Sequence, residues 1–164
     1  MMKRFIVMGV SGCGKSSIGA EFAARINARF LDGDDLHSAA NIEKMAAGIP
    51  LNDQDRAPWL SSVGSAFQDE ELPLVIGCSA LKRTYRDIIR QHAGGPVAFV
   101  HLDGTRELIA GRMAARKGHF MPDKLLDSQF AALEPPGSDE DAVRIDIDQE
   151  PEEIVSRIVE QFLD

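Results

Sequence analysis

Cysteine is scarce in this chain of 164 residues, which has only Cys13 and Cys78. Two cysteines cannot build the disulfide framework of a small secreted domain or a zinc site made of thiolates, so neither is expected. No apolar run approaches the roughly 20 residues that a membrane-spanning helix needs. The first apolar residues lead into a glycine-rich motif and not into a signal-peptide cleavage site. We therefore expect a cytoplasmic protein with no membrane association.

Positive charge is also in short supply. The 18 Lys and Arg residues are outnumbered by 26 Asp and Glu residues, and the formal net charge is -8. This balance disfavours a general binder of nucleic acid or of anionic membranes. The hydrophobic content of 44% and the charged content of 27% are typical of a globular protein. Because no repeat, low-complexity segment or long linker divides the chain, we expect a single domain over residues 1–164.

The stretch Gly9–Ser16 matches G-x-x-x-x-G-K-[ST], the phosphate-binding P-loop. Phe5–Met8 precedes it and is typical of a buried strand, while Ile18, Phe22 and Ile26 follow at the spacing of one helix face. Strand, loop and helix therefore occur in the order that the motif needs. The alternative is a glycine-rich turn before a helix that binds nothing.

In a P-loop the glycines let successive backbone N–H groups point at phosphate oxygens, and the helix N-terminus adds partial positive charge. Lys15 would reach the β- and γ-phosphates, and the Ser16 hydroxyl would ligate Mg²⁺. The same helix terminus and Lys15 would favour a reactive Cys13 thiolate, although a small side chain that merely fits the loop explains this cysteine equally well. The expected ATP-binding residues in the loop are Gly9, Val10, Ser11, Gly12, Cys13, Gly14, Lys15, Ser16 and Ser17.

Apolar stretches that are typical of strands alternate with stretches of helical spacing along the rest of the chain. This alternation predicts an α/β fold with a parallel sheet covered by helices on both faces, whose ligands bind at the carboxyl ends of the strands. The expected strands are 5–8, 28–32, 74–78, 97–102 and 143–147, and the main expected helices are 37–48, 53–67, 83–91, 105–116, 122–133 and 154–162.

Three carboxylates and an imidazole follow the second expected strand, in the stretch Asp32–His37. In a P-loop kinase this position faces the γ-phosphate, where a carboxylate can accept a hydroxyl proton or hold a water of Mg²⁺. We expect Asp34 to be the base and Asp32 to help hold the metal. The alternative is an Asp-rich turn that caps the next helix, and His37 alone could equally be a helix-start residue.

The third expected strand ends in Gly77-Cys78-Ser79 and has no acidic residue at its tip. Motor ATPases and GTPase switches usually carry a Walker-B aspartate there. Asp103 does follow the fourth strand, but a capped turn explains it equally well. The missing acid favours a kinase of small molecules over a motor or a switch.

Four blocks of this sequence resemble the gluconate kinase (gluconokinase) family, in order and spacing, over nearly the whole chain. One small departure is Ser38, which stands where a proline commonly follows the histidine. The blocks are Gly33–His37, residues 41–60 (Asn41-x-x-Lys44-Met45-x-x-Gly48-x-Pro50-Leu51-x-Asp53-x-Asp55-Arg56-x-Pro58-Trp59-Leu60), Cys78–Arg86, and Gly118–Pro122 with Leu125–Phe130 and Leu133–Pro136.

The resemblance implies transfer of the ATP γ-phosphoryl group to the 6-hydroxyl of D-gluconate, with Mg²⁺ as cofactor, in D-gluconate degradation. It also implies a P-loop NTPase-type, three-layer fold like that of shikimate and adenylate kinases, with a five-stranded parallel sheet and a mobile lid. The substrate-binding helical segment would span about residues 37–67 and the lid about residues 112–124. A homodimer is expected on the resemblance alone.

Gluconate carries a carboxylate and a row of hydroxyls, so cations and hydrogen-bonding groups should line its site. Trp59 is expected to pack in the core of the substrate-binding segment. Each expected cation could instead be a solvated surface charge, which is the usual fate of Lys and Arg. The expected substrate-binding residues are Asp34, His37, Lys44, Arg56, Lys82, Arg83 and, in the fourth block, His119.

Arg112 and Arg116 are four residues apart and therefore share a helix face. By analogy with related kinases this face would lie over the nucleotide, with Arg112 binding ATP and Arg116 catalytic at the transferring phosphoryl group. The alternative is an ordinary surface pair.

Two other functions remain open at this point. One is a kinase of shikimate or of a nucleoside monophosphate, although residues 41–60 do not look like a base-recognition pocket. The other is a nucleotide-binding switch without an acceptor, which the absence of both an N-K-x-D guanine motif and a Walker-B acid disfavours.

Overall fold

The computed structural model describes residues 2–115 and 123–162. Five strands form one parallel sheet in the order β2-β3-β1-β4-β5, which confirms the predicted α/β sheet. The non-sequential order places β1 at the centre, so the loop that follows it emerges in the middle of the sheet edge. The strands are β1 Arg4–Met8, β2 Arg29–Asp32, β3 Leu74–Gly77, β4 Ala98–Asp103 and β5 Ala142–Asp146.

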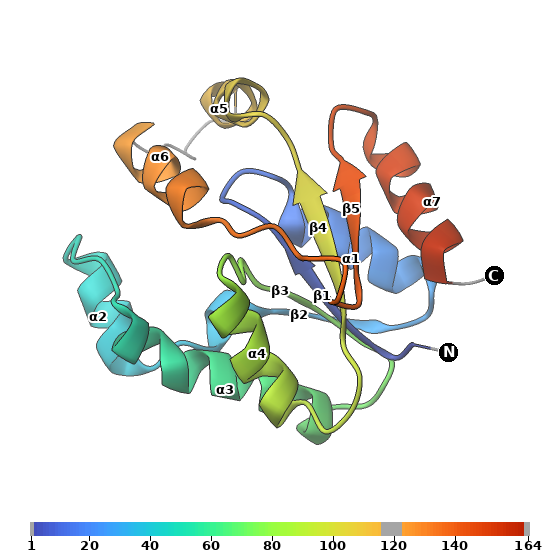
Figure 1. Cartoon of the computed structure of the whole chain (residues 1–164), viewed down its shortest axis with the longest axis horizontal. Helices are drawn as coiled ribbons and strands as arrows, with labels where there is room; N and C mark the ends of the chain where they lie inside the picture. Colours follow the sequence, from blue (N-terminus) through green and yellow to red (C-terminus); the bar gives the residue numbers. More distant parts are fainter. Residues whose placement is uncertain (1, 116–122, 163–164) are drawn as a thin grey trace.

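Helices cover both faces of the sheet, as predicted. Helices α1 and α7 pack on one face and α3 and α4 on the other, while α5 and α6 lie beyond the ends to which the strand arrows point (Figure 1). No helix among the described residues combines the length and the apolar character needed to cross a bilayer. The helices are α1 Lys15–Arg25, α2 Ala39–Ala46, α3 Asp53–Asp69, α4 Arg83–His92, α5 Arg106–Ala115, α6 Asp123–Ala132 and α7 Pro151–Phe162.

Local capping explains where these helices begin. The helix expected from residue 37 begins only at Ala39, because Gly33–Leu36 forms a 3₁₀ turn and the Ser38 hydroxyl then accepts the Asn41 N–H at 3.1 Å. Thr105 caps α5 as predicted, since its hydroxyl accepts the Leu108 N–H at 3.1 Å. Helix α3 begins with a capping box.

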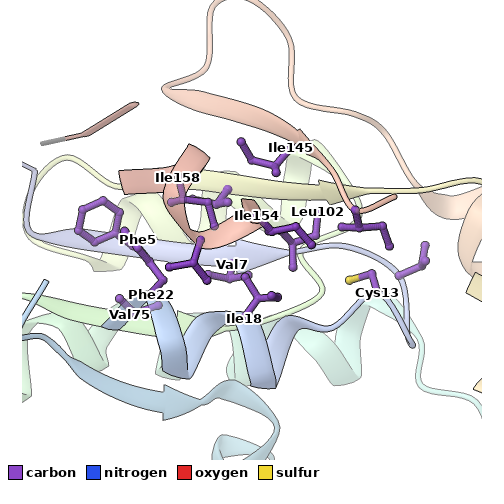
Figure 2. Packing of buried hydrophobic residues seen from close by; sticks show 14 of the residues in the cluster. Phe5, Val7, Cys13, Ile18, Phe22, Val75, Leu102, Ile145, Ile154 and Ile158 are labelled. Atoms are coloured by element: carbon purple, nitrogen blue, oxygen red, sulfur yellow. The ribbon is translucent and has the colours of Figure 1, made fainter. Parts of the chain in front are cut away.

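Side chains on β1 alternate between two cores. Phe5 and Val7 pack with α1 and α7, and Figure 2 shows Phe5, Val7, Ile18, Phe22, Ile154 and Ile158 filling that layer. Ile6 and Met8 point the other way, into the core beneath α3 and α4. Full burial of such side chains stabilises a fold by about 1.5–3 kcal/mol each. A strand apolar on both faces therefore fixes the phosphate loop to the centre of the molecule.

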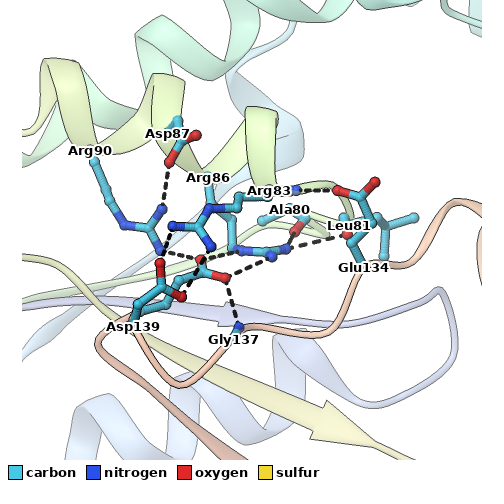
Figure 3. A network of polar contacts seen from close by, with 10 residues as sticks. Ala80, Leu81, Arg83, Arg86, Asp87, Arg90, Glu134, Gly137 and Asp139 are labelled. Carbon is cyan, nitrogen blue, oxygen red and sulfur yellow. Dashed lines mark hydrogen bonds and ion pairs between the residues drawn. The ribbon is translucent and has the colours of Figure 1, made fainter.

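A buried ion pair connects α4 to the segment that precedes β5. The guanidinium of Arg86 is fully buried and donates to both carboxylate oxygens of Glu140, at 2.7 and 3.1 Å, while its remaining nitrogen bonds the Ala80 carbonyl at 2.9 Å. Arg90 and the Gly137 N–H also donate to Glu140. Figure 3 shows Arg83, Arg86 and Arg90 of α4 directed toward the segment of Gly137 and Asp139. Burial would raise the pKa of Glu140, but these hydrogen bonds outweigh it and lower the pKa to about 2.

We predict that Glu140→Gln destabilises the protein by about 3 kcal/mol, because it leaves the buried Arg86 charge without its carboxylate. Urea unfolding measures the free energy. The matched control is Arg29→Gln, which breaks the exposed pair of Arg29 with Glu70 and should cost no more than about 1 kcal/mol. Equal losses in the two variants would contradict a structural role for the buried pair.

The low pKa of Glu140 predicts that acid lowers the unfolding free energy of the wild-type protein more than that of Glu140→Gln. A carboxyl whose pKa is lower in the folded chain contributes stability above its unfolded pKa, and this is lost as the pH falls through the folded value. For Glu140 this stability is lost as the pH falls from 4.5 to about 2. The difference in unfolding free energy between wild type and Glu140→Gln should therefore shrink over this window and stay constant above it.

Candidate functional site

The phosphate loop leaves the carboxyl end of β1 and turns directly into α1. Gly14 caps this helix with φ of 98°, a left-handed conformation that side chains with a Cβ rarely adopt. The Gly9 N–H donates to the Ser79 carbonyl at 3.2 Å, which ties the loop to the end of β3. The Lys15 ammonium curls over the loop and donates to the carbonyls of Gly9 and Val10, at 3.1 Å each. The loop thus lies between a strand and a helix as predicted, and its lysine is held at the loop backbone.

Cys13 is not the reactive thiolate that its position suggested. Its side chain is 2% exposed in the core beside α1. Burial raises its pKa above the ordinary value, and this effect outweighs the nearby charge of Lys15. The prediction of a thiolate was therefore wrong, and the alternative of a small side chain that fits the loop explains the residue.

The acidic stretch follows β2, which is separated by β3 from the strand that carries the phosphate loop. Asp32 accepts the Asp34 N–H at 3.0 Å, which shapes the 3₁₀ turn. The pKa of Asp34 is raised, first by desolvation and then by the Asp32 charge, while Lys15 and His37 oppose the shift. Asp34 and Lys15 are therefore within electrostatic reach of each other. An acid with a raised pKa beside the P-loop lysine has the properties of a general base.

His37 is held in orientation by the ring of Trp59. Its ring stacks on Trp59 with the centroids 4.1 Å apart, and the Trp59 indole N–H donates to the Gly33 carbonyl at 2.7 Å. Trp59 packs in the core as predicted, but it also orients this imidazole. Gly33 must be glycine, since a Cβ there would lie 2.6 Å from the Gly77 carbonyl oxygen.

The tautomer of His37 follows from its contact with Asn41. The buried Asn41 amide nitrogen lies 2.9 Å from the Asp55 carbonyl oxygen, which can only accept, so this nitrogen is a donor. The same nitrogen lies 3.2 Å from His37 Nδ1, which must therefore accept. Burial, the largest effect, lowers the pKa of His37 and keeps the ring neutral. His37 thus carries its proton on Nε2 and offers an N–H donor near Asp34.

A cavity of about 170 Å³, here called the acceptor cavity, lies between α3, α4 and α6. It brings together the predicted residues Arg56 and Lys82, both at 5.6 Å from the ring centre of Tyr85. The Arg56 guanidinium also donates to the Tyr85 hydroxyl at 3.3 Å. The residues that line the acceptor cavity are Arg56, Trp59, Ser79, Leu81, Lys82, Tyr85, Ser128, Gln129 and Ala132.

Two other predicted substrate ligands are engaged with carboxylates away from this lining. Lys44 donates to both oxygens of Asp55, at 3.0 and 2.9 Å, and so joins α2 to α3. Arg83 forms a two-bond pair with Asp139, at 3.0 and 2.6 Å. The predicted residues Arg116 and His119 lie outside the described residues.

Gln129 is a site residue that the sequence did not single out. Its carboxamide oxygen accepts the Ser11 N–H at 2.7 Å, and its nitrogen donates to the Ser11 hydroxyl at 3.0 Å. It also lines the acceptor cavity. Gln129 therefore connects α6, the phosphate loop and the acceptor cavity. Its only sequence signal is its place in a family block, because 118 positions separate it from Ser11.

A second cavity, of about 490 Å³, is lined in part by Cys13 and Gly14 of the phosphate loop. Arg112 contributes to it and donates to the Ile147 carbonyl at 2.6 Å. Apolar walls beside a phosphate loop suit a planar base whose phosphates extend into the loop. The lining residues are Cys13, Gly14, Ser17, Ile18, Glu21, Arg112, Ala115, Gln149, Glu150, Pro151 and Ile154.

The donors near the loop fit a magnesium ion. The described residues contain no group of three or more His, Cys, Asp or Glu that could hold a metal. Mg²⁺ at a phosphate site, however, takes only one or two protein oxygens and completes its shell with phosphate and water. Ser16 at the start of α1 and Asp32 at the end of β2 supply oxygens of that type.

Comparisons with known proteins agree with this geometry. Residues 5–136 match the family model described as an AAA domain. A thermosensitive gluconokinase of Escherichia coli is 51% identical, over 96% of this chain and 83% of that protein. The crystal structure of a gluconokinase from Sinorhizobium meliloti is 45% identical, with a TM-score of 0.86 over 96% of this chain and 94% of that chain.

A more distant neighbour supports the fold alone. Shikimate kinase from Bacteroides thetaiotaomicron is 17% identical, with a TM-score of 0.68 over 96% of this chain and 97% of that one. Half of the residues, by contrast, are shared with the E. coli gluconokinase over nearly the whole length. The family resemblance in the sequence is thus confirmed, and the chain belongs to the gluconokinase family of P-loop kinases.

Proposed function

We propose that this protein is a gluconokinase that transfers the γ-phosphoryl group of ATP to the 6-hydroxyl of D-gluconate, giving 6-phospho-D-gluconate and ADP. The observation that carries this proposal is a pair of cavities, one lined by the phosphate loop and the other connected to the same loop through Gln129. The larger cavity suits the base of ATP, and the acceptor cavity holds the cations that an acid substrate needs. The names of the relatives support the same reaction.

ATP would bind with its phosphates in the loop and its base in the larger cavity, beside Arg112. The Lys15 ammonium, now on the carbonyls of Gly9 and Val10, would turn to the β- and γ-phosphates. Ser16 and Asp32 would hold a Mg²⁺ ion, whose charge offsets that of the phosphates. The loop backbone and Lys15 would then stabilise the charge that develops on the transferring group.

Gluconate would bind in the acceptor cavity with its carboxylate at Arg56 and Lys82. His37, which offers its Nε2 proton, would donate to a substrate hydroxyl, and Asp34 would accept the proton of the 6-hydroxyl. Gln129 would hold the phosphate loop in register with this cavity through Ser11.

Several further assignments rest on the family resemblance. We propose that residues 112–124 act as a lid and residues 37–67 as the substrate-binding segment, within one kinase domain. Arg116 would meet the phosphoryl group after lid closure, and His119 would contact substrate. Lys44 and Arg83 would reach substrate only by leaving Asp55 and Asp139. The protein would act in the cytoplasm in D-gluconate degradation, as a homodimer.

A coupled ADP-release assay with ATP and a panel of acids and polyols tests the reaction. We expect turnover with D-gluconate, and little or none with shikimate, a nucleoside monophosphate or D-glucose. Turnover with shikimate or a nucleotide in place of gluconate would overturn the proposal.

We predict that Lys15→Ala lowers turnover by at least about 10³-fold and leaves the melting temperature unchanged, because the ammonium acts on the phosphoryl group and not on the core. The matched control is Lys3→Ala, which removes the same charge from an exposed site before β1 and should retain wild-type turnover. A Lys15→Ala enzyme with near-normal turnover would contradict the assigned role of the loop.

We predict that Asp34→Asn lowers turnover by roughly 10²–10⁴-fold with little effect on ATP affinity, because the amide orients the hydroxyl but accepts no proton. If positioning matters more than proton removal, Asp34→Ala will be far worse than Asp34→Asn. A fully active Asp34→Asn enzyme would exclude Asp34 as the base.

The raised pKa of Asp34 predicts how turnover depends on pH. A base must be ionised, so turnover should fall as the pH drops through the pKa of Asp34, and this limb should lie above the ordinary pKa of an aspartate, 3.8. The acid limb of kcat/KM, measured at pH values where the fold is intact, should be absent from the residual activity of Asp34→Asn. An identical limb in both enzymes would assign it to another group.

A further inference from the structure

A carboxylate of the protein itself pairs with the two cations that line the acceptor cavity. Asp53, the first residue of α3, accepts a hydrogen bond from the Tyr85 hydroxyl at 2.5 Å. Its oxygens lie 3.6 Å from the Arg56 guanidinium and 3.9 Å from the Lys82 ammonium. Three lining groups of the cavity thus converge on one carboxylate.

The contacts of Asp53 with the cations are long, and the side chain is open to solvent. Its exposed fraction is 65%, compared with 2% for Glu140, which holds Arg86 at 2.7 Å. At 3.6 and 3.9 Å the ion pairs of Asp53 are too long for strong hydrogen bonds, and solvent screens them. Asp53 can therefore leave the two cations at little cost, unlike Glu140, and the contact that a ligand must replace is the 2.5 Å hydrogen bond from Tyr85.

The groups that hold Asp53 are also those that a substrate carboxylate would need. Arg56 and Lys82 offer positive charge and Tyr85 offers a hydroxyl proton, and a hydroxyl can donate to only one acceptor at a time. A gluconate carboxylate that accepts the Tyr85 hydroxyl must therefore take the place of Asp53 there, next to both cations.

We propose that Asp53 is an internal counter-ion that the carboxylate of gluconate displaces, and that this exchange selects an anionic acceptor. The inference rests on the function proposed above and adds a specificity-determining residue to it. An anionic substrate restores the charge balance of Arg56 and Lys82 after Asp53 has left. A neutral polyol cannot do so, because it would leave two cations without a counter-charge.

The electrostatics of the unliganded cluster agree with this exchange. The hydrogen bond from Tyr85, followed by the charges of Lys82 and Arg56, lowers the pKa of Asp53, so the counter-ion is ionised at neutral pH. Burial and the same hydrogen bond raise the pKa of Tyr85, so its hydroxyl remains a donor.

Steady-state kinetics of Asp53→Asn test the competition. Removal of the competing charge should lower the KM for gluconate about two- to fivefold, the range of one exposed ion pair, and leave the KM for ATP unaltered. The matched control is Asp69→Asn, which makes the same charge change at the exposed far end of α3 and should leave both constants as in wild type. An unchanged or higher KM for gluconate in Asp53→Asn would overturn the inference.

A second measurement uses the wild-type protein and needs no variant. Carbon-13 NMR of the Asp53 carboxyl should show its pKa rising toward the ordinary value when gluconate saturates the protein, because the displaced carboxylate loses Tyr85 and both cations. D-glucitol, a neutral polyol of the same length, should not produce this rise. An Asp53 pKa that stays low with gluconate bound would show that this carboxylate keeps its partners and would overturn the inference.

These outcomes separate the inference from the proposed function. A wild-type enzyme that fails to phosphorylate gluconate would refute the function. A wild-type enzyme that phosphorylates gluconate while the Asp53 tests fail would refute only the exchange.

Discussion

The site depends on one backbone constraint, which is that the phosphate loop must present its N–H groups to a single point. Gly14 supplies the left-handed turn into α1, and β1 anchors the loop because the strand is buried on both faces. The hydrogen bond from Gly9 to Ser79 then fixes the distance between the loop and the end of β3. Because β3 pairs with both β1 and β2, the same framework places the turn that contains Asp34 on the far side of β3 from the phosphate loop.

The distance from each cation to its carboxylate partner indicates which cations hold the fold together and which can bind a substrate carboxylate. In this acidic chain, Arg86, Lys44 and Arg83 each hold a carboxylate through two short hydrogen bonds. The pair of Arg86 with Glu140 is buried and costs several kcal/mol to break, whereas the pairs of Lys44 and Arg83 are partly exposed and cost less. Within the described part of the chain, Arg56 and Lys82 meet a carboxylate only through the longer contacts with Asp53, and both line the acceptor cavity. A cation whose partner is distant and exposed is the one that a substrate carboxylate can recruit.

Hydrogen bonds also decide what the neutral groups offer. The Asn41 amide satisfies the Asp55 carbonyl and His37 Nδ1 at once, and Trp59 supports the ring from one face. Gln129 performs a similar task for Ser11, since it uses both ends of its carboxamide. These buried or half-buried amides pre-organise the groups on either side of the proposed transfer, so little reorganisation is left for the reaction itself.

The sequence by itself determined the order of strands and helices, the phosphate loop and the acidic turn after β2, because these depend on local periodicity and on residues adjacent in the chain. It also indicated the family through long blocks such as residues 41–60. Only the tertiary structure decided that Cys13 is buried, that Arg56 and Lys82 share a cavity, and that Gln129 reaches Ser11. The burial of a side chain and the pairing of polar groups depend on contacts between segments that lie tens of residues apart. Local sequence patterns do not indicate which of these segments will pack together.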